Sequence, residues 1–161
     1  MVVILFGVTG AGKTVVGTLL AQELGWPFYD GDTFHAPASV EKMRAGVPLS
    51  DDDRWPWLDA LRNLIAGCLA KGENAVLACS ALKAAYREHL RIDERVRLVH
   101  LEGDFQLFAM RLQEREGHFM DPALLGSQFE TLEEQDGEAV VVNVAGSPRE
   151  IVTEIRTRLG V

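Results

Sequence analysis

A glycine-rich segment near the start of the chain has the residue types that bind phosphate groups. It reads Gly7, Val8, Thr9, Gly10, Ala11, Gly12, Lys13, Thr14. In this pattern the backbone N–H groups surround the phosphates of a nucleotide, the lysine reaches the β- and γ-phosphates, and the last hydroxyl binds Mg²⁺. The segment therefore predicts a nucleoside triphosphate site in which Lys13 binds phosphate and Thr14 binds the metal ion.

Two carboxylates follow a short apolar segment further along the chain. Asp30 and Asp32 flank Gly31, directly after Phe28 and Tyr29. Phosphoryl transfer to an alcohol is helped by a carboxylate that accepts the hydroxyl proton, and a second carboxylate can hold the water shell of Mg²⁺. Asp32 is therefore a candidate base and Asp30 a candidate metal ligand. An Asp-Gly-Asp turn without a catalytic role fits the same spacing, which does not separate the two interpretations.

A run of three aspartates precedes Arg54. Asp51, Asp52 and Asp53 suit the N-terminus of a helix, because carboxylates are stabilised at that end of the helix dipole. The run can also belong to a polar binding site. Arg54 is then either a surface ion-pair partner or a ligand for an anionic substrate, and both interpretations stay open.

Two arginines lie four residues apart, at Arg111 and Arg115, and therefore on one face of a helix. A segment carrying arginines over a nucleotide supplies positive charge to the phosphoryl group in transfer. The alternative is an exposed helix face on which Glu114 and Glu116 are the ion-pair partners. His118, in the loop that follows, is either an anion contact or an ordinary loop residue.

The elements that position these residues alternate between strands and helices. We expect strands at residues 2–6, 28–30, 75–79, 98–101 and 139–144, and helices near residues 82–92, 104–115, 122–134 and 148–159. A further helix starts after the glycine-rich segment and ends at Gly25. A long one begins at Ser50, with Asp53 three residues on as an acidic capping box, and ends at Gly72.

This alternation predicts an α/β fold of the P-loop NTPase type. A five-stranded parallel sheet would be covered by helices on both faces, giving three layers, α/β/α, in one domain over residues 1–161. Functional groups are expected beyond the carboxyl ends of the strands. The polar residues that follow the predicted strands are therefore expected to gather at one edge of the sheet.

Composition narrows the class of protein. The net charge of −8 argues against a nucleic-acid partner, which would need clustered Lys and Arg. Cys68 and Cys79 lie in apolar segments and are expected to be reduced core residues, as in a cytoplasmic protein. The N-terminus lacks a basic region and a cleavage site, so we expect neither a signal peptide nor a membrane span.

Several blocks together resemble the gluconokinase family of small P-loop enzymes, related in fold to shikimate and adenylate kinases. The resemblance runs in order from Val2 to about Leu132. It is carried by Lys13-Thr14, Asp30-Gly31-Asp32-Thr33-Phe34-His35, Glu41-Lys42-Met43, Gly46, Pro48-Leu49, Asp51-Asp52-Asp53-Arg54, Pro56-Trp57-Leu58, Cys79-Ser80-Ala81-Leu82-Lys83, Gly103-Asp104-Phe105 and Gly117-His118-Phe119.

The resemblance implies ATP- and Mg²⁺-dependent phosphorylation of D-gluconate to 6-phospho-D-gluconate. By resemblance, Asp32 orients the acceptor hydroxyl and Asp30 aids the metal. The contacts for gluconate would be His35, Arg54, Lys83 and His118. Relatives also suggest a homodimer.

The resemblance further implies a short lid over about residues 111–122. Arg115 would be the lid arginine of the active site and Arg111 would flank the adenine, which the 145–148 loop would hold by backbone contacts.

Two other functions fit the phosphate-binding segment. The first is a regulatory NTPase, but the fifth strand is followed by Asn143-Val144-Ala145-Gly146 rather than a guanine-binding motif, and the third ends in Cys79-Ser80 rather than an aspartate. The second is a kinase for another small acceptor, such as shikimate or a related sugar acid. Fold alone would not separate that kinase from a gluconokinase.

Overall fold

The computed structural model describes residues 1–114, 122–134 and 137–161. Five strands form one sheet in the order β2-β3-β1-β4-β5, and every neighbouring pair is parallel. The strands are β1 (Val2–Phe6), β2 (Phe28–Asp30), β3 (Ala75–Ala78), β4 (Val96–Glu102) and β5 (Ala139–Asn143). The expected five-stranded parallel sheet is confirmed, with β4 longer than the apolar residues alone indicated.

Helices connect the strands. They are α1 (Lys13–Leu24), the short 3₁₀ helix η1 (Gly31–Phe34), α2 (Pro37–Arg44), α3 (Asp51–Lys71), α4 (Ala84–Leu90), α5 (Phe105–Glu114), α6 (Pro122–Thr131) and α7 (Pro148–Leu159). Gly25 and Gly72 end α1 and α3 in the left-handed conformation, as expected. The expected helices at 82–92 and 122–134 are shorter in the structure, and α2 and η1 were not expected.

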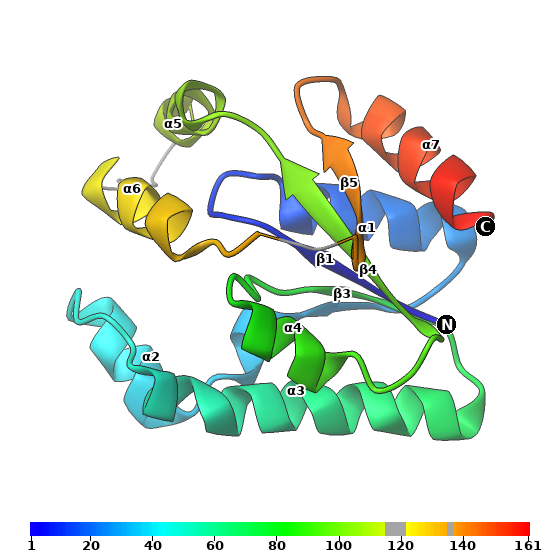
Figure 1. Ribbon diagram of the computed structural model, residues 1–161, viewed down its shortest axis with the longest axis horizontal. Coiled ribbons are helices and arrows are strands. Elements are labelled where there is room, and N and C mark those ends of the chain that lie inside the picture. Colours follow the sequence, from blue (N-terminus) through cyan, green and yellow to red (C-terminus); the bar gives the residue numbers. More distant parts are fainter. Residues whose placement is uncertain (115–121, 135–136) are drawn as a thin grey trace.

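Alternate residues of the strands pack into separate layers on the two faces of the sheet. Val3 and Leu5 of β1 contact the layer that contains α1, α5 and α7. Ile4 and Phe6 point the other way, into the layer of α3 and α4. Figure 1 shows α1 and α7 on one side of the strands and α3 and α4 on the other. The predicted α/β/α arrangement is confirmed.

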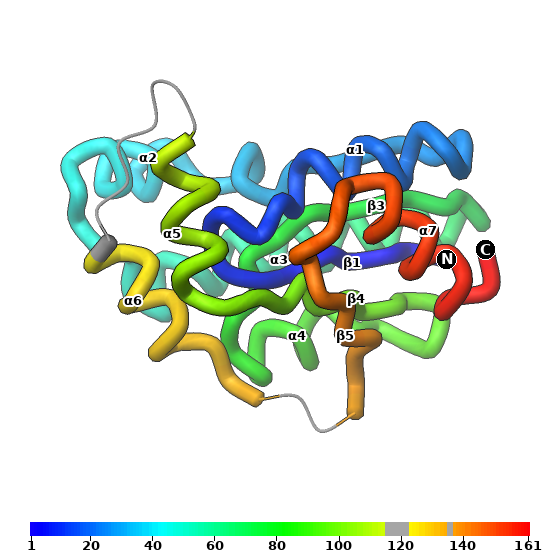
Figure 2. The backbone as a smooth tube through the Cα atoms, turned by 90° about the horizontal axis from the view of Figure 1, so that it is seen from above, coloured from blue at the N-terminus to red at the C-terminus, as the bar shows by residue number. Residues whose placement is uncertain are grey.

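The carboxyl edge of the sheet defines one end of the molecule. In both Figure 1 and Figure 2, α2, α5 and α6 lie at one end, and the two chain termini lie toward the opposite end. Each expected functional segment of the described chain follows the carboxyl end of a strand or the N-terminus of α3. Cys68 and Cys79 are buried and unbridged, as expected. Within the described ranges, no helix is long and apolar enough to cross a membrane.

Candidate active site

The glycine-rich segment turns tightly between β1 and α1. Gly7 has φ 154°, and a Cβ there would lie 2.8 Å from the carbonyl oxygen of Leu101 in β4, so a side chain would not fit. Gly12 is the N-cap of α1 in the left-handed conformation, and no described side chain caps this helix end. The positive end of the α1 dipole and its first N–H groups therefore face the loop, as an anion site requires.

Lys13 lies across its own loop. Its Nζ donates to the carbonyl oxygens of Gly7 at 2.9 Å and Val8 at 3.0 Å. Thr14 is exposed in the first turn of α1. The ammonium and the hydroxyl thus lie at the mouth of the loop, where the sequence predicted phosphate and metal contacts.

Asp30 and Asp32 stand at the carboxyl end of β2 with different surroundings. The Asp30 carboxylate caps η1 by accepting the Asp32 N–H at 3.0 Å, and the Asp30 carbonyl accepts the Thr33 hydroxyl at 2.7 Å. Asp30 therefore does form the turn that the sequence left open as an alternative. The Asp32 carboxylate is exposed.

The carboxyl ends of β2 and β3 lie close together, next to the buried Cys79. Burial raises the pKa of Cys79 to about 12. The carboxylates of Asp32 and Asp30 contribute to this raised pKa, and the charge of Lys13 opposes them. A Cβ on Gly31 would be 2.7 Å from the Ala78 carbonyl oxygen, which explains why η1 can approach β3 so closely. The sheet thus brings the phosphate loop and the two aspartates to one place.

Two of the three aspartates that open α3 make different contacts. Ser50 and Asp53 form the expected capping box, with Asp53 N–H donating to the Ser50 hydroxyl at 3.1 Å and Ser50 N–H donating to the Asp53 carboxylate at 2.9 Å. Lys42 of α2 also donates to Asp53. This bond and the Ser50 contacts lower the pKa of Asp53 to about 2. The interpretation as a helix N-terminus therefore holds for Asp53.

Asp51 instead joins a charged cluster with residues far along the chain. It accepts the Lys83 ammonium at 2.8 Å and the Tyr86 hydroxyl. Bonds from Lys83 and then Tyr86 hold the pKa of Asp51 below its usual value, and Arg54 lowers it further. Burial and Asp51 raise the pKa of Tyr86, which Arg54 opposes. Lys83 is therefore paired with Asp51, and Arg54, three residues further along α3, is a second cation whose charge acts on this pair.

His35 is placed between this cluster and Asp32. Its ring stacks on the Trp57 indole, with centroids 4.4 Å apart and planes 14° apart, and Trp57 Nε1 donates to the Gly31 carbonyl at 2.7 Å. Burial lowers the pKa of His35, Asp32 opposes the shift and Arg54 adds to it. Its buried Nδ1 has no hydrogen-bond partner among the described residues. A neutral imidazole with an unsatisfied nitrogen is suited to a polyhydroxy ligand.

Arg111 of α5 contacts the residue that follows β5. Its guanidinium donates to the carbonyl oxygen of Val144, which leads into the 145–148 loop. The two features expected at the adenine are therefore neighbours. Arg115 and His118, expected in the lid, lie outside the described residues.

Sequence reasoning missed the contacts of Asp51, Trp57 and Tyr86, and also Arg87 of α4, which is fully buried and donates hydrogen bonds to the Ala81 and Leu82 carbonyls just before Lys83. The spacing of Lys83 and Tyr86, three residues apart at the start of a helix, could have shown that they share a face. Their common partner Asp51 is 32 residues from Lys83, a pairing that no local pattern contains. Arg87 has no sequence signal, because an arginine in a short helix usually faces water.

Comparisons with known proteins show what this chain is similar to. The family model of shikimate kinase matches residues 9–159. Gluconokinase of Gluconobacter oxydans is 48% identical over 144 residues, which cover 89% of this chain and 81% of that protein. The thermosensitive gluconokinase of Escherichia coli is 42% identical, with 95% and 88% covered.

Two solved structures are also similar to this chain. A gluconokinase from Sinorhizobium meliloti has a TM-score of 0.88 at 42% identity, covering 98% of this chain and 90% of that one. A shikimate kinase from Aquifex aeolicus has a TM-score of 0.63 at 23% identity, covering 99% and 96%, and shares the fold.

Proposed function

The chain belongs to the shikimate kinase family and, inside it, to the gluconokinases, and on this basis we propose that it phosphorylates D-gluconate. The γ-phosphoryl group of ATP passes to the C6 hydroxyl, the bond to the β-phosphate oxygen breaks, and the products are ADP and 6-phospho-D-gluconate. The observation that carries this proposal is that the phosphate loop after β1, Asp32 after β2 and Lys83 after β3 all lie at the carboxyl edge of one sheet, where Lys83 pairs with Asp51 of α3, the helix that also carries Arg54. Anion sites for both substrates are thus next to each other.

For ATP, the loop of residues 7–14 would bind the phosphates by the N–H groups that are not used inside the protein, as that of Thr9 is by Gln128, and by the Lys13 ammonium. Arg111 and the 145–148 loop would hold the adenine. Arg115 remains the arginine expected at the transferring phosphoryl group.

Mg²⁺ fits the oxygen donors present at the loop. The exposed hydroxyl of Thr14 would bind the ion, and Asp30 would hold one of its waters, since Mg²⁺ prefers oxygen ligands and keeps several waters. When bound, Mg²⁺ neutralises charge on the β- and γ-phosphates.

For gluconate, Arg54 and Lys83 would bind the carboxylate, His35 would bind hydroxyl groups, and Asp32 would align the C6 hydroxyl and accept its proton. His118 stays a prediction for a further contact. We keep one domain over residues 1–161 with a lid over about 111–122, a homodimer and a cytoplasmic location as predictions.

Product identification tests the reaction. Incubation with Mg-ATP and D-gluconate should give a phosphate monoester at C6 together with an equal amount of ADP, measured by phosphorus NMR. ADP formed together with free phosphate instead of an ester would mean an NTPase rather than a kinase.

Arg54→Ala should mainly weaken acceptor binding. Losing a charge-assisted hydrogen bond of about 1.5–3 kcal/mol should raise the KM for gluconate about 10- to 100-fold, with the KM for ATP unchanged. Steady-state kinetics with each substrate varied would measure this. Arg91→Ala, an exposed arginine at the C-terminus of α4, is the control and should match the wild type. A raised KM for ATP alone would contradict the role of Arg54.

The capping box of α3 should affect both stability and substrate binding. Ser50→Ala should lower the free energy of unfolding by about 0.5–2 kcal/mol, the usual cost of a lost helix cap. The control is Ser147→Ala, which removes the equivalent box of α7 and should cost a similar amount. Only Ser50→Ala should also raise the KM for gluconate, because α3 starts at Asp51 and Arg54. Denaturant titrations would measure the stability of both variants, and steady-state kinetics would measure their KM for gluconate. If both variants changed this KM equally, α3 would not position the acceptor.

A further inference from the structure

The end of α6 and the residues that follow it contact both halves of the candidate active site. We call residues 128–134 the brace. At its start, the Gln128 side-chain oxygen accepts the backbone N–H of Thr9 at 2.6 Å. Thr9 is the third residue of the phosphate loop and lies 119 positions away in sequence. The brace is therefore tied directly to the loop expected to bind ATP.

At its other end, the brace is tied to the loop that carries Lys83. Glu133 N–H donates to the Leu82 carbonyl at 2.9 Å. Arg87 completes the link, because one guanidinium nitrogen donates to the Glu133 and Glu134 carbonyls and the other donates to the Ala81 and Leu82 carbonyls, at 2.8–3.2 Å. One side chain thus joins the brace to the loop that carries Lys83, which we call the acceptor loop because Lys83 is expected to bind the acceptor.

Several contacts hold the Arg87 side chain in this position. Its side chain is fully buried, its Nε donates to Glu138 at 2.7 Å, and its guanidinium lies 5.0 Å from the ring centroid of Phe6, the residue before the phosphate loop. A buried charge is tolerated only when it is paired and hydrogen-bonded. These contacts meet that condition, so the Arg87 link is rigid.

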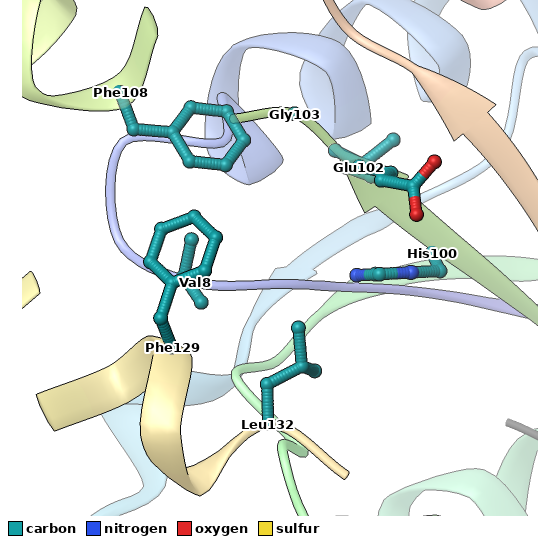
Figure 3. A pocket seen from close by; sticks show the side chains of 8 residues that line it. Val8, His100, Glu102, Gly103, Phe108, Phe129 and Leu132 are labelled. Atoms are coloured by element: carbon teal, nitrogen blue, oxygen red, sulfur yellow. The ribbon is translucent and has the colours of Figure 1, made fainter. Parts of the chain in front are cut away.

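The brace packs against the core beside the phosphate loop, because the centroid of the Phe129 ring lies 5.9 Å from those of Phe105 and Phe108, but this packing is incomplete. A cavity of about 100 Å³ lies between the brace and the loop, lined by Val8, His100, Phe108, Phe129 and Leu132 among others. Figure 3 shows Phe129 of the brace next to Phe108, with His100 of β4 on the other side of this hollow and Leu132 below it. A gap in the packing leaves the neighbouring side chains room to shift, whereas a hydrogen bond is directional. The Gln128–Thr9 bond therefore adds a fixed contact between the brace and the loop that packing alone does not supply.

We infer that the brace sets the spacing between the phosphate loop and the acceptor loop, with Gln128 and Arg87 as positioning residues. The inference rests on the proposed function. Phosphoryl transfer needs the acceptor hydroxyl in line with the γ-phosphoryl group, and a misplacement of about 1 Å costs up to about 100-fold in rate. Neither side chain is expected to touch substrate, so their effect is on turnover rather than on binding.

The test compares Gln128→Ala, Arg87→Lys and the double variant. Each single variant should lower kcat about 3- to 10-fold, the rate equivalent of one hydrogen bond, with both KM values within about two-fold of wild type. Since both residues hold one element, the double variant should lose no more kcat than the worse single variant. Thr131→Ala, which removes a hydroxyl bond within α6, is the matched control and should keep wild-type kcat.

Thermal melts measured beside the kinetics separate positioning from folding. If Arg87→Lys does not fold, Glu138→Gln takes its place, because it weakens the Arg87 contact at a partly exposed side chain. A Gln128→Ala enzyme with unchanged kcat, or a double variant whose kcat loss is the product of the single losses, would overturn the inference. A wild-type enzyme without activity on gluconate would instead overturn the proposed function.

Discussion

Lys13→Ala should remove measurable kinase activity and leave the fold intact. The ammonium is expected to bind the β- and γ-phosphates by charge-assisted hydrogen bonds of about 1.5–3 kcal/mol each, so its loss should cost about 10²–10⁴ in rate. In the structure, Lys13 Nζ is 2.9 and 3.0 Å from two carbonyl oxygens of its own loop. Removing these contacts affects a half-buried side chain and not the core, so folding should not depend on them.

A coupled ADP-release assay and a circular dichroism melt measure both parts of this prediction. Lys71→Ala, an exposed lysine in the last turn of α3, is the control and should behave as wild type. A folded Lys13→Ala protein with near-normal turnover would mean that this loop is not the catalytic one.

Asp32→Asn should separate catalysis from binding. The substitution keeps size and shape and removes the charge that accepts the hydroxyl proton, so kcat should fall about 10²–10⁴-fold, the usual range for a positioned base. The ATP affinity should change little, because the phosphate loop supplies those contacts. The Asp32 side chain is exposed, so a substrate hydroxyl can reach its carboxylate.

Kinetics on both substrates, with ATP binding measured by calorimetry, would check the Asp32 prediction. Asp93→Asn is the control, because Asp93 forms a local ion pair with Arg95 just before β4, at the amino edge of the sheet. If Asp32→Asn altered only the affinity for ATP, or kept kcat within a few-fold of wild type, Asp32 would not be the base.

Much of the fold could be predicted because its signals are local. A continuous apolar run before the glycine-rich loop is typical of a buried parallel strand, and β1 is fully buried. The capping box at Ser50 and the glycine at Gly72 marked both ends of α3. In contrast, α2 is largely exposed and buries only Ser39, so the chain there has no apolar stripe that could have predicted a helix.

The sequence could place the candidate residues beyond the strands but could not show their contacts with one another. The spacing singled out Lys13 and Asp32 as candidates, but around Asp32 it did not separate a site from a turn, and the structure shows that Asp30 does cap η1. Asp51, Asp52 and Asp53 are identical side chains in a row, so the sequence does not show which of them binds Lys83. That choice depends on contacts between residues far apart in sequence. The ion pair between buried Arg87 of α4 and Glu138, the residue before β5, has no periodicity that a sequence can display.

The most direct test of the account is an acceptor panel assayed for ADP release with Mg-ATP. The panel would contain D-gluconate, other sugar acids, shikimate and nucleoside monophosphates. Because the Arg54–Lys83–His35 cluster combines two cations with a neutral hydrogen-bonding ring, D-gluconate should have the highest kcat/KM, by about 100-fold or more over shikimate and the nucleotides. Equal or faster turnover of shikimate or a nucleoside monophosphate would contradict the assignment.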